Sequence, residues 1–235
     1  MNYIIKKGKI ISEEGIPHLP RWFCDDLVAF EADKYGISKV EYFNRTTKGS
    51  EKVFIDDMWG GMRFYIEQAG CHYRQNLKKC EVMPYGFCGE WHHKNYVFAY
   101  EQRIINNCIF ICLKPNCEFE NDLRVSAEFY DNWSLITRSD GDNRYRSGVE
   151  RIWNGWSFDG KYLKNSYSEN NNETHIAMGS AGDLKYINRS IGNPKHILSA
   201  ECRGEYIFAI AFDISDEKAE KRLRDTLNNY GSYIN

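Results

Sequence analysis

The end of the chain joins a strand that is apolar on both faces to the one clear helix signal in the sequence. In residues 205–213, large aromatic and aliphatic side chains alternate with Ile and Ala, so neither face of the strand is polar. Such a strand belongs inside a sheet that is covered on both sides. Ser215 is a good helix N-cap, and two acidic residues follow it in the first turn. The apolar residues of this helix recur every fourth position: Ala219, Leu223 and Leu227.

The residues before this helix read as short strands separated by turns. We count roughly sixteen strand-like segments, with no internal repeat and no Pro/Ser-rich linker. Asn106-Asn107 is typical of a turn between two such segments, and so is Asp159-Gly160. Trp59-Gly60-Gly61 is expected to close a hairpin between strands 52–58 and 62–68. The pattern predicts a mainly β protein, a large two-sheet antiparallel β-sandwich with one C-terminal α-helix.

We expect two parts in the chain. Residues 1–214 form the β-sandwich domain, and residues 215–235 form the C-terminal helix and the start of a linker to a missing domain. A chain of 235 residues is long enough to bury a large core. Aromatic residues make up 15% of it, and such side chains pack well on pleated sheets. The same rings can also line a groove for a sugar, which has apolar faces and polar edges.

The net charge and the N-terminal residues argue against several classes of binding partner and against secretion. A net charge of −2 gives no electrostatic reason to expect nucleic acid or an anionic membrane as a partner. No apolar run approaches the ~20 residues that a membrane-spanning helix needs. The N-terminal residues lack the apolar region and cleavage site of a signal peptide. We therefore expect a cytoplasmic protein.

The cysteines favour reduced, structural thiols. Eight are present, none forms a Cys-x-x-Cys pair, and Cys108 and Cys112 lie in an apolar strand. Cys88 precedes His92 and His93, but their spacing matches no standard zinc motif. Strand alternation would also place the two imidazoles on opposite faces. We expect no metal and no cofactor.

The densest candidate binding segment surrounds the two glycines at 60 and 61. Asp57, Trp59 and Arg63 converge there, at a turn where a backbone can approach a ligand closely. The competing interpretation is a tight hairpin whose aspartates accept hydrogen bonds from the turn and pair with the arginine.

Three further tryptophans complete the candidate carbohydrate-binding set. Trp153 and Trp156 lie three residues apart, so they face opposite sides of a strand unless Gly155 forms a bulge. A bulge would let both indoles flank one ligand, whereas the alternative puts one in the core and one at an interface. Trp91 is the third candidate. Each of these indoles also fits plain core packing.

No segment of the sequence matches a catalytic motif that would identify a reaction. The motifs Gly-x-Ser-x-Gly and Gly-x-Gly-x-x-Gly and the P-loop are all missing from it. Pairs such as Glu128 with Asp131, or Glu67 with Glu101, could serve glycoside hydrolysis, which needs two acids around the bond. With 33 acidic residues in the chain, nothing selects one pair. We assign no catalytic residue.

Several segments together resemble a known domain. They are Leu27–Asp33, Tyr42–Asn44, residues 101–111, and Tyr206–Asp213 with the helix that follows. The chain resembles the N-terminal β-sandwich, or supersandwich, domain of glycoside hydrolases of the glucoamylase and glycogen-debranching type. The resemblance implies an accessory domain without catalytic residues, because the catalytic acids of such enzymes lie in their (α/α)6 barrel. The implied partners are that barrel, which the domain packs on and shapes, and carbohydrate.

Two other functions stay open. A mutarotase-like aldose epimerase is built on a similar sandwich and would use a histidine and a glutamate as acid and base, nominally His175 and Glu205. A stand-alone carbohydrate-binding module is the other. A gene that continues past Asn235 into a helical segment rich in acids would favour the accessory domain.

A domain that packs on a barrel should expose an apolar face. We expect an aromatic patch beside residues 215–233, containing Tyr230 and Tyr233, with indoles at its margin. In the alternative interpretation, the helix covers its own sheet and the indoles belong to the core.

The expected redox state gives a direct prediction. Thiol titration of the denatured protein without reductant should find all eight cysteines free, because a cytoplasmic chain keeps its thiols reduced. A titration that finds six or fewer thiols, restored to eight by a reductant, would contradict it.

Overall fold

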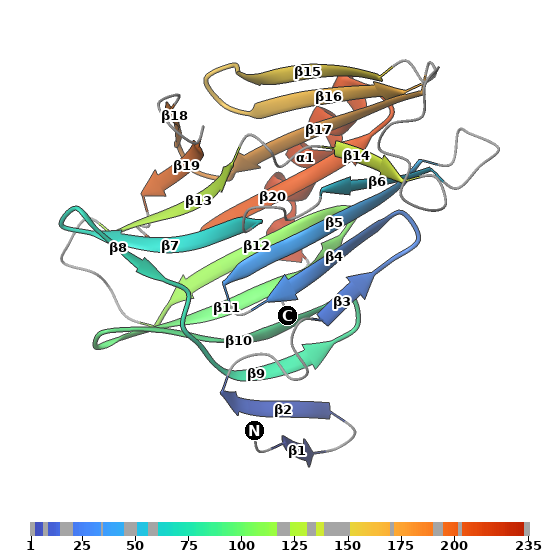
Figure 1. Ribbon diagram of the computed structural model, residues 1–235. Coiled ribbons are helices and arrows are strands. Elements are labelled where there is room, and N and C mark those ends of the chain that lie inside the picture. The colour runs from blue at the N-terminus through green and yellow to red at the C-terminus, as the bar shows by residue number, and fades with distance from the viewer. Residues whose placement is uncertain are drawn as a thin grey trace.

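The computed structural model shows two layers of strands joined by turns, with one α-helix near the C-terminus (Figure 1). Within the described part of the chain lie twenty β-strands, the α-helix α1 (Asp216–Asn228) and a short 3-10 helix, η1 (Tyr230–Ser232). The described residues are 3–6, 9–14, 21–33, 35–44, 51–55, 61–116, 123–130, 135–138, 151–169, 172–189, 195–201 and 204–232.

The first sheet has ten antiparallel strands. In spatial order they are β1 (Tyr3–Lys6), β2 (Lys9–Glu14), β9 (Leu77–Met83), β10 (Gly86–His93), β11 (Tyr96–Ile105), β12 (Cys108–Pro115), β20 (Tyr206–Asp213), β17 (Asn172–Ser180), β16 (Leu163–Glu169) and β15 (Arg151–Phe158). The predicted inner strand is β20, which pairs with β12 on one side and β17 on the other. That prediction is confirmed.

The second sheet also has ten strands and faces the first. Its main path runs β14 (Leu135–Arg138), β6 (Glu51–Ile55), β5 (Gly36–Asn44), β7 (Met62–Gln68), β13 (Arg124–Tyr130), β19 (Lys195–Glu201) and β18 (Leu184–Arg189). Three more strands attach to it: β3 (Arg21–Cys24), β4 (Val28–Asp33) and β8 (Cys71–Arg74). The predicted two-sheet antiparallel sandwich with one C-terminal helix is therefore confirmed.

The main core lies between the two sheets and is built from alternate positions of each strand. From β20, Phe208 meets Phe64 of the second sheet edge-on, with ring centroids 6.3 Å apart. Phe212 stacks on Tyr42 at 5.7 Å. These four side chains are at most 4% exposed. Aromatic pairs of this kind add to the burial energy, which explains the high aromatic content.

Helix α1 covers the outer face of the first sheet (Figure 1). Ser215 caps it by accepting a hydrogen bond from the Lys218 N–H, as the sequence predicts. The predicted apolar stripe is buried, at 0% exposure for Leu223, and it packs on Ala209 and Ala211 of β20. Small residues on this face of the strand let the helix axis come close to the sheet.

The predicted apolar patch beside the helix is wrong. Across the described residues, the large apolar side chains that remain exposed are Trp22, Tyr85 and Ile187, and none belongs to α1 or to the strands beneath it. Tyr230 is half-buried against the helix-side core, and Tyr233 lies outside the described residues. The helix instead closes its own sheet. In this same part of the chain, no helix is long and apolar enough to cross a membrane.

The predicted hairpin of strands 52–58 and 62–68 is also wrong. Strands β6 and β7 do not pair with each other; they lie one after the other along the same edge of β5. Gly61 has φ +60°, and a Cβ there would lie 2.1 Å from the Ile37 carbonyl oxygen. The glycine therefore serves a close approach to the backbone of β5.

The burial of Leu223 predicts how much the packing of α1 contributes to the free energy of unfolding. Leu223→Ala should lower the free energy of unfolding by roughly 3 kcal/mol, because it leaves a cavity between α1 and the sheet. Urea unfolding measures this, with Lys221→Ala as the matched control on the exposed side of the helix. Equal stability of the two variants would show that the helix is not part of the cooperative core.

Candidate functional site

The outer face of the second sheet carries an unusual concentration of polar side chains. Along β7, Phe64 and Ile66 point into the core, so Arg63 and Tyr65 point outward. The neighbouring strand β13 also places Glu128 on this outer face, yet that side chain is only 3% exposed. We call the following residues the outer-face cluster: Asp33, Tyr35, Arg63, Tyr65, His72, Arg74 and Glu128.

An ion pair crosses β5 at one end of the outer-face cluster. Arg63 Nη1 lies 2.5 Å from Asp33 Oδ2, although these residues belong to strands on opposite sides of Gly36. Gly36 has no side chain to separate them. A Cβ there would lie 2.2 Å from the Met62 carbonyl oxygen, so only glycine fits. The Tyr35 ring contacts the Arg63 guanidinium at 5.6 Å.

A buried carboxylate orients an exposed imidazole at the other end of the outer-face cluster. His72 Nδ1 lies 3.1 Å from Glu128 Oε1, and the His72 side chain is 39% exposed. This contact fixes the orientation of the imidazole ring. Tyr65 packs edge-on against the imidazole at 6.0 Å. A histidine held in this way can exchange a hydrogen bond with a ligand.

The structure places the predicted site residues in very different surroundings. Asp57 and Trp59 lie outside the described residues. Arg63 belongs to the outer-face cluster. Trp91 has no exposed surface and packs against Tyr100 inside the sandwich, at 6.1 Å between ring centroids. It points inward on β10, so it offers no surface to a ligand in this structure.

The strand that carries Trp153 and Trp156 contains a bulge, which the sequence left open. The register of β15 against β16 shifts between Asn154 and Ser157, which is where Gly155 lies. Trp156 consequently packs inward, 5.0 Å from Phe129. The side chain of Trp153 lies outside the described part of the structure. The bulge thus serves the core at Trp156.

Sequence reasoning missed the pairing of His72 with Glu128. Glu128 stood out only as one acid of a possible pair with Asp131, which lies outside the described residues. The other pair, Glu67 with Glu101, lies on the outer faces of two different sheets, so it cannot flank one bond. Glu128 occupies a regular polar position of the alternating strand 123–130, so the sequence held no signal that its side chain is buried.

The predicted acid and base of an epimerase are not a pair. His175 lies opposite Asp213 at one end of β20, whereas Glu205 precedes the other end of that strand. Eight residues of extended chain span about 25 Å. His175 is instead bound by Glu173, and Glu205 by Lys114. These side chains cannot act together on one sugar ring.

The cysteine and histidine positions follow strand alternation. His93 is 4% exposed and points inward, whereas His92 lies on the other face and contacts Glu90 at 2.7 Å, as predicted. The six cysteines in the described residues are all thiols: Cys24, Cys71, Cys80, Cys88, Cys108 and Cys112. Within that same part of the chain, no group of three or more His, Cys, Asp or Glu residues has the arrangement of a metal site.

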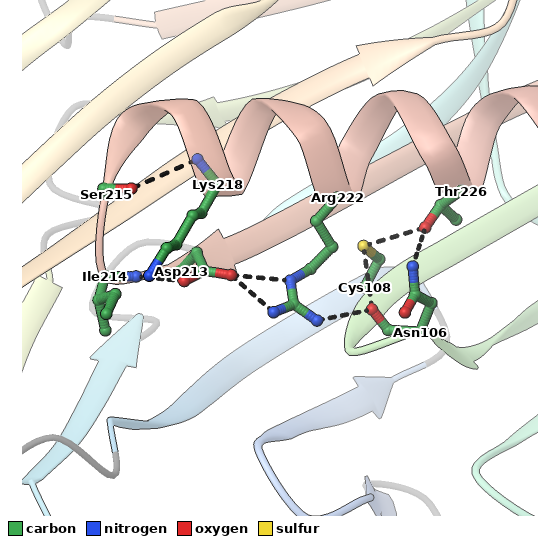
Figure 2. A network of polar contacts seen from close by, with 8 residues as sticks. All are labelled: Asn106, Cys108, Asp213, Ile214, Ser215, Lys218, Arg222 and Thr226. Carbon is green, nitrogen blue, oxygen red and sulfur yellow. Dashed lines mark hydrogen bonds and ion pairs between the residues drawn. The ribbon is translucent and has the colours of Figure 1, made fainter.

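A second polar network fixes α1 to the first sheet (Figure 2). Arg222 donates to Asp213 Oδ2 at 2.6 Å and to the Asn106 carbonyl at 3.2 Å. Thr226 donates to the Cys108 sulfur at 3.4 Å, and burial raises the pKa of that thiol to about 12. A shallow surface cavity of about 300 Å³ lies beside these groups. Its inner polar groups bind one another, so the network docks the helix.

Comparison with known proteins gives the fold alone. No family model matches the chain, and no curated protein matches it. A bacterial glucoamylase solved with acarbose is similar, with TM-score 0.50 and 14% identity. A protein from the human microbiome assigned as a kojibiose phosphorylase has TM-score 0.49 and 9% identity. A galactose mutarotase related enzyme from Lactobacillus acidophilus has TM-score 0.43 and 9% identity over 83% of this chain and 98% of its own.

The coverage of these similarities is unequal. The match to the glucoamylase takes in 95% of this chain but 39% of the glucoamylase chain. For the kojibiose phosphorylase the figures are 99% and 36%. The chain therefore spans well under half the length of these two enzymes.

The burial of Glu128 predicts the effect of removing its partner. His72→Ala should lower the free energy of unfolding by about 1–3 kcal/mol, because a buried carboxylate loses a hydrogen-bond partner. His92→Ala is the matched control: His92 is similarly exposed, but its partner Glu90 is 30% exposed. We expect it to cost about 0–1 kcal/mol. If thermal or urea unfolding shows the same loss of stability for both variants, the contact between His72 and Glu128 does not stabilise the fold as stated here.

Proposed function

We propose that the chain is a non-catalytic accessory domain of a carbohydrate-active enzyme, which packs on a helical catalytic domain and helps to shape its active site. In this proposal residues 215–235 contain the closing helix and the start of the connection to that domain. Carbohydrate is the ligand class of the assembled enzyme.

One observation carries the proposal. Nearly the whole chain superposes on a minor part of a bacterial glucoamylase that was solved with acarbose, at 95% and 39% coverage. A fold of this size thus occurs as one part of a larger enzyme that binds a sugar-like inhibitor.

The surroundings of the buried acids support a non-catalytic role. Glu31 accepts a hydrogen bond from Ser38, Glu128 contacts His72, and Asp213 binds Arg222. Each of these carboxylates is engaged by a neighbour that joins two elements of the sandwich. Glycoside hydrolysis needs two acids directed at one bond, one of them available as a proton donor. The three carboxylates stabilise the fold.

The experiment measures activity in the purified chain. We expect no turnover of maltose, trehalose or aryl glucosides, and no acceleration of α/β anomer exchange of glucose or galactose followed by polarimetry. The catalytic domain encoded with the chain, supplied as a separate protein or in one polypeptide, should be required for glycoside cleavage or phosphorolysis.

Two outcomes would contradict the proposal. Turnover of a glycoside by the chain alone, abolished by one Asp or Glu substitution, would make it a hydrolase. Anomer exchange by the chain alone, abolished by His72→Ala and retained in His92→Ala, would make it an epimerase with a site other than His175 and Glu205.

A further inference from the structure

One indole in the described part of the chain is exposed. Trp22 on β3 retains 40% of its surface, because Phe23 next to it takes the inward position and packs on Phe30 at 5.2 Å. Trp22 therefore projects from the outer face of the second sheet, the same face that carries the outer-face cluster. An exposed indole costs hydrophobic energy, and its flat apolar face is available to a ligand.

A carboxylate and an ammonium group lie next to this indole. Trp22 pairs across the strands with Glu31, and Glu31 pairs with Lys39. Ser38 donates a hydrogen bond of 2.6 Å to Glu31 Oε2, which fixes the carboxylate, and Lys39 Nζ lies 3.8 Å from the same oxygen. The Lys39 side chain is 42% exposed. The Glu31 side chain is itself only 11% exposed, so it positions Lys39, and the apolar platform is bordered by one exposed donor, the Lys39 ammonium group.

This platform continues into the outer-face cluster. Glu31 and Asp33 are two residues apart on β4 and share a face, and Asp33 binds Arg63. Arg74 lies beyond them, with its guanidinium 5.4 Å from the centre of the Tyr35 ring. From Trp22 to Arg74 the surface extends roughly 15 Å, as judged from strand spacing and rise. That length suits several linked sugar units better than one.

The charges along this surface alternate in sign. Glu31 and Asp33 are acids, whereas Lys39, Arg63 and Arg74 are cations, so donors and acceptors are interleaved. A phosphorylated ligand would favour a cluster of cations, and a protein partner would favour a larger apolar patch than a single indole. A neutral chain of hydroxyl groups with apolar ring faces fits both the indole and the mixed polar border.

We infer that the surface from Trp22 to Arg74 binds a neutral oligosaccharide, with one sugar ring stacked on Trp22. Lys39, which Glu31 holds in place, donates hydrogen bonds to the hydroxyl groups of that ring, and Arg74 contacts a sugar unit further along. The choice of ligand class rests on the proposed function. The site itself rests on the exposed indole and on the exposed ammonium group of Lys39 beside it.

Isothermal titration of the purified chain with maltose, maltopentaose and cellopentaose tests this site. We expect at least one pentasaccharide to bind, and Trp22→Ala to weaken it tenfold or more, while Trp22→Phe keeps part of the affinity. Tyr85→Ala is the matched control, because Tyr85 is 55% exposed but lies in the turn between β9 and β10. It should leave the affinity unchanged. Arg74→Met should weaken the pentasaccharide more than the disaccharide.

The outcomes separate this site from the proposed function. Lack of binding of all three sugars at millimolar concentration, or equal affinity of Trp22→Ala and the wild type, overturns the site, whether or not a catalytic domain assembles with the chain. Trp22-dependent binding by a chain that has no catalytic partner would keep the site and overturn the accessory role. Thermal unfolding of each variant confirms that the comparison is made between folded proteins.

Discussion

Strand β20 is apolar on both faces because it separates two cores, and the rest of the fold is arranged around it. Its aromatic side chains, such as Phe208, fill the space between the sheets. Its alanines on the other face let α1 lie close enough to bury Leu223 completely. A polar residue on either face would have no water to bind. The position of this strand therefore explains why the helix stays with the sandwich.

Helix α1 covers the outer face of the first sheet, so the outer face of the second sheet is the candidate surface for a ligand. The outer face of the second sheet holds the ion pair of Asp33 with Arg63, the contact of His72 with Glu128 and the exposed indole of Trp22. The first two each join strands that flank a third strand: β4 and β7 across β5, and β8 and β13 across β7. The indole contributes little to the core, which is why we assign the ligand surface to it.

Sequence alone predicted the parts of the fold that depend on neighbouring residues. The helix cap at Ser215, the inner strand β20 and the left-handed turn at Asn106 and Asn107 all follow from local chemistry, and the turn residues have φ +51° and +56°. The arrangement of β6 and β7 did not follow from the sequence. β6 forms a hairpin with β5, which precedes it in the chain, and β7 then pairs with the other end of the same β5 edge and not with β6.

The candidate site was harder to predict for the same reason. Its residues come from β3, β4, β7, β8 and β13, and only pairing brings them together. Arg63 was anticipated, whereas Trp22 was not, since a four-residue strand is too short for alternation to show which side is inward. Trp91 was chosen for its indole, but its inward position on β10 was decided by packing.

The central claim is that this sandwich works as one part of a larger carbohydrate-active enzyme. Sedimentation of the purified chain with a separately expressed helical catalytic domain, the partner that the proposal requires, tests that claim most directly. The account predicts a stable complex of one sandwich with one catalytic domain. Two independently sedimenting species at micromolar concentration, with the catalytic domain fully active on its own, would contradict it.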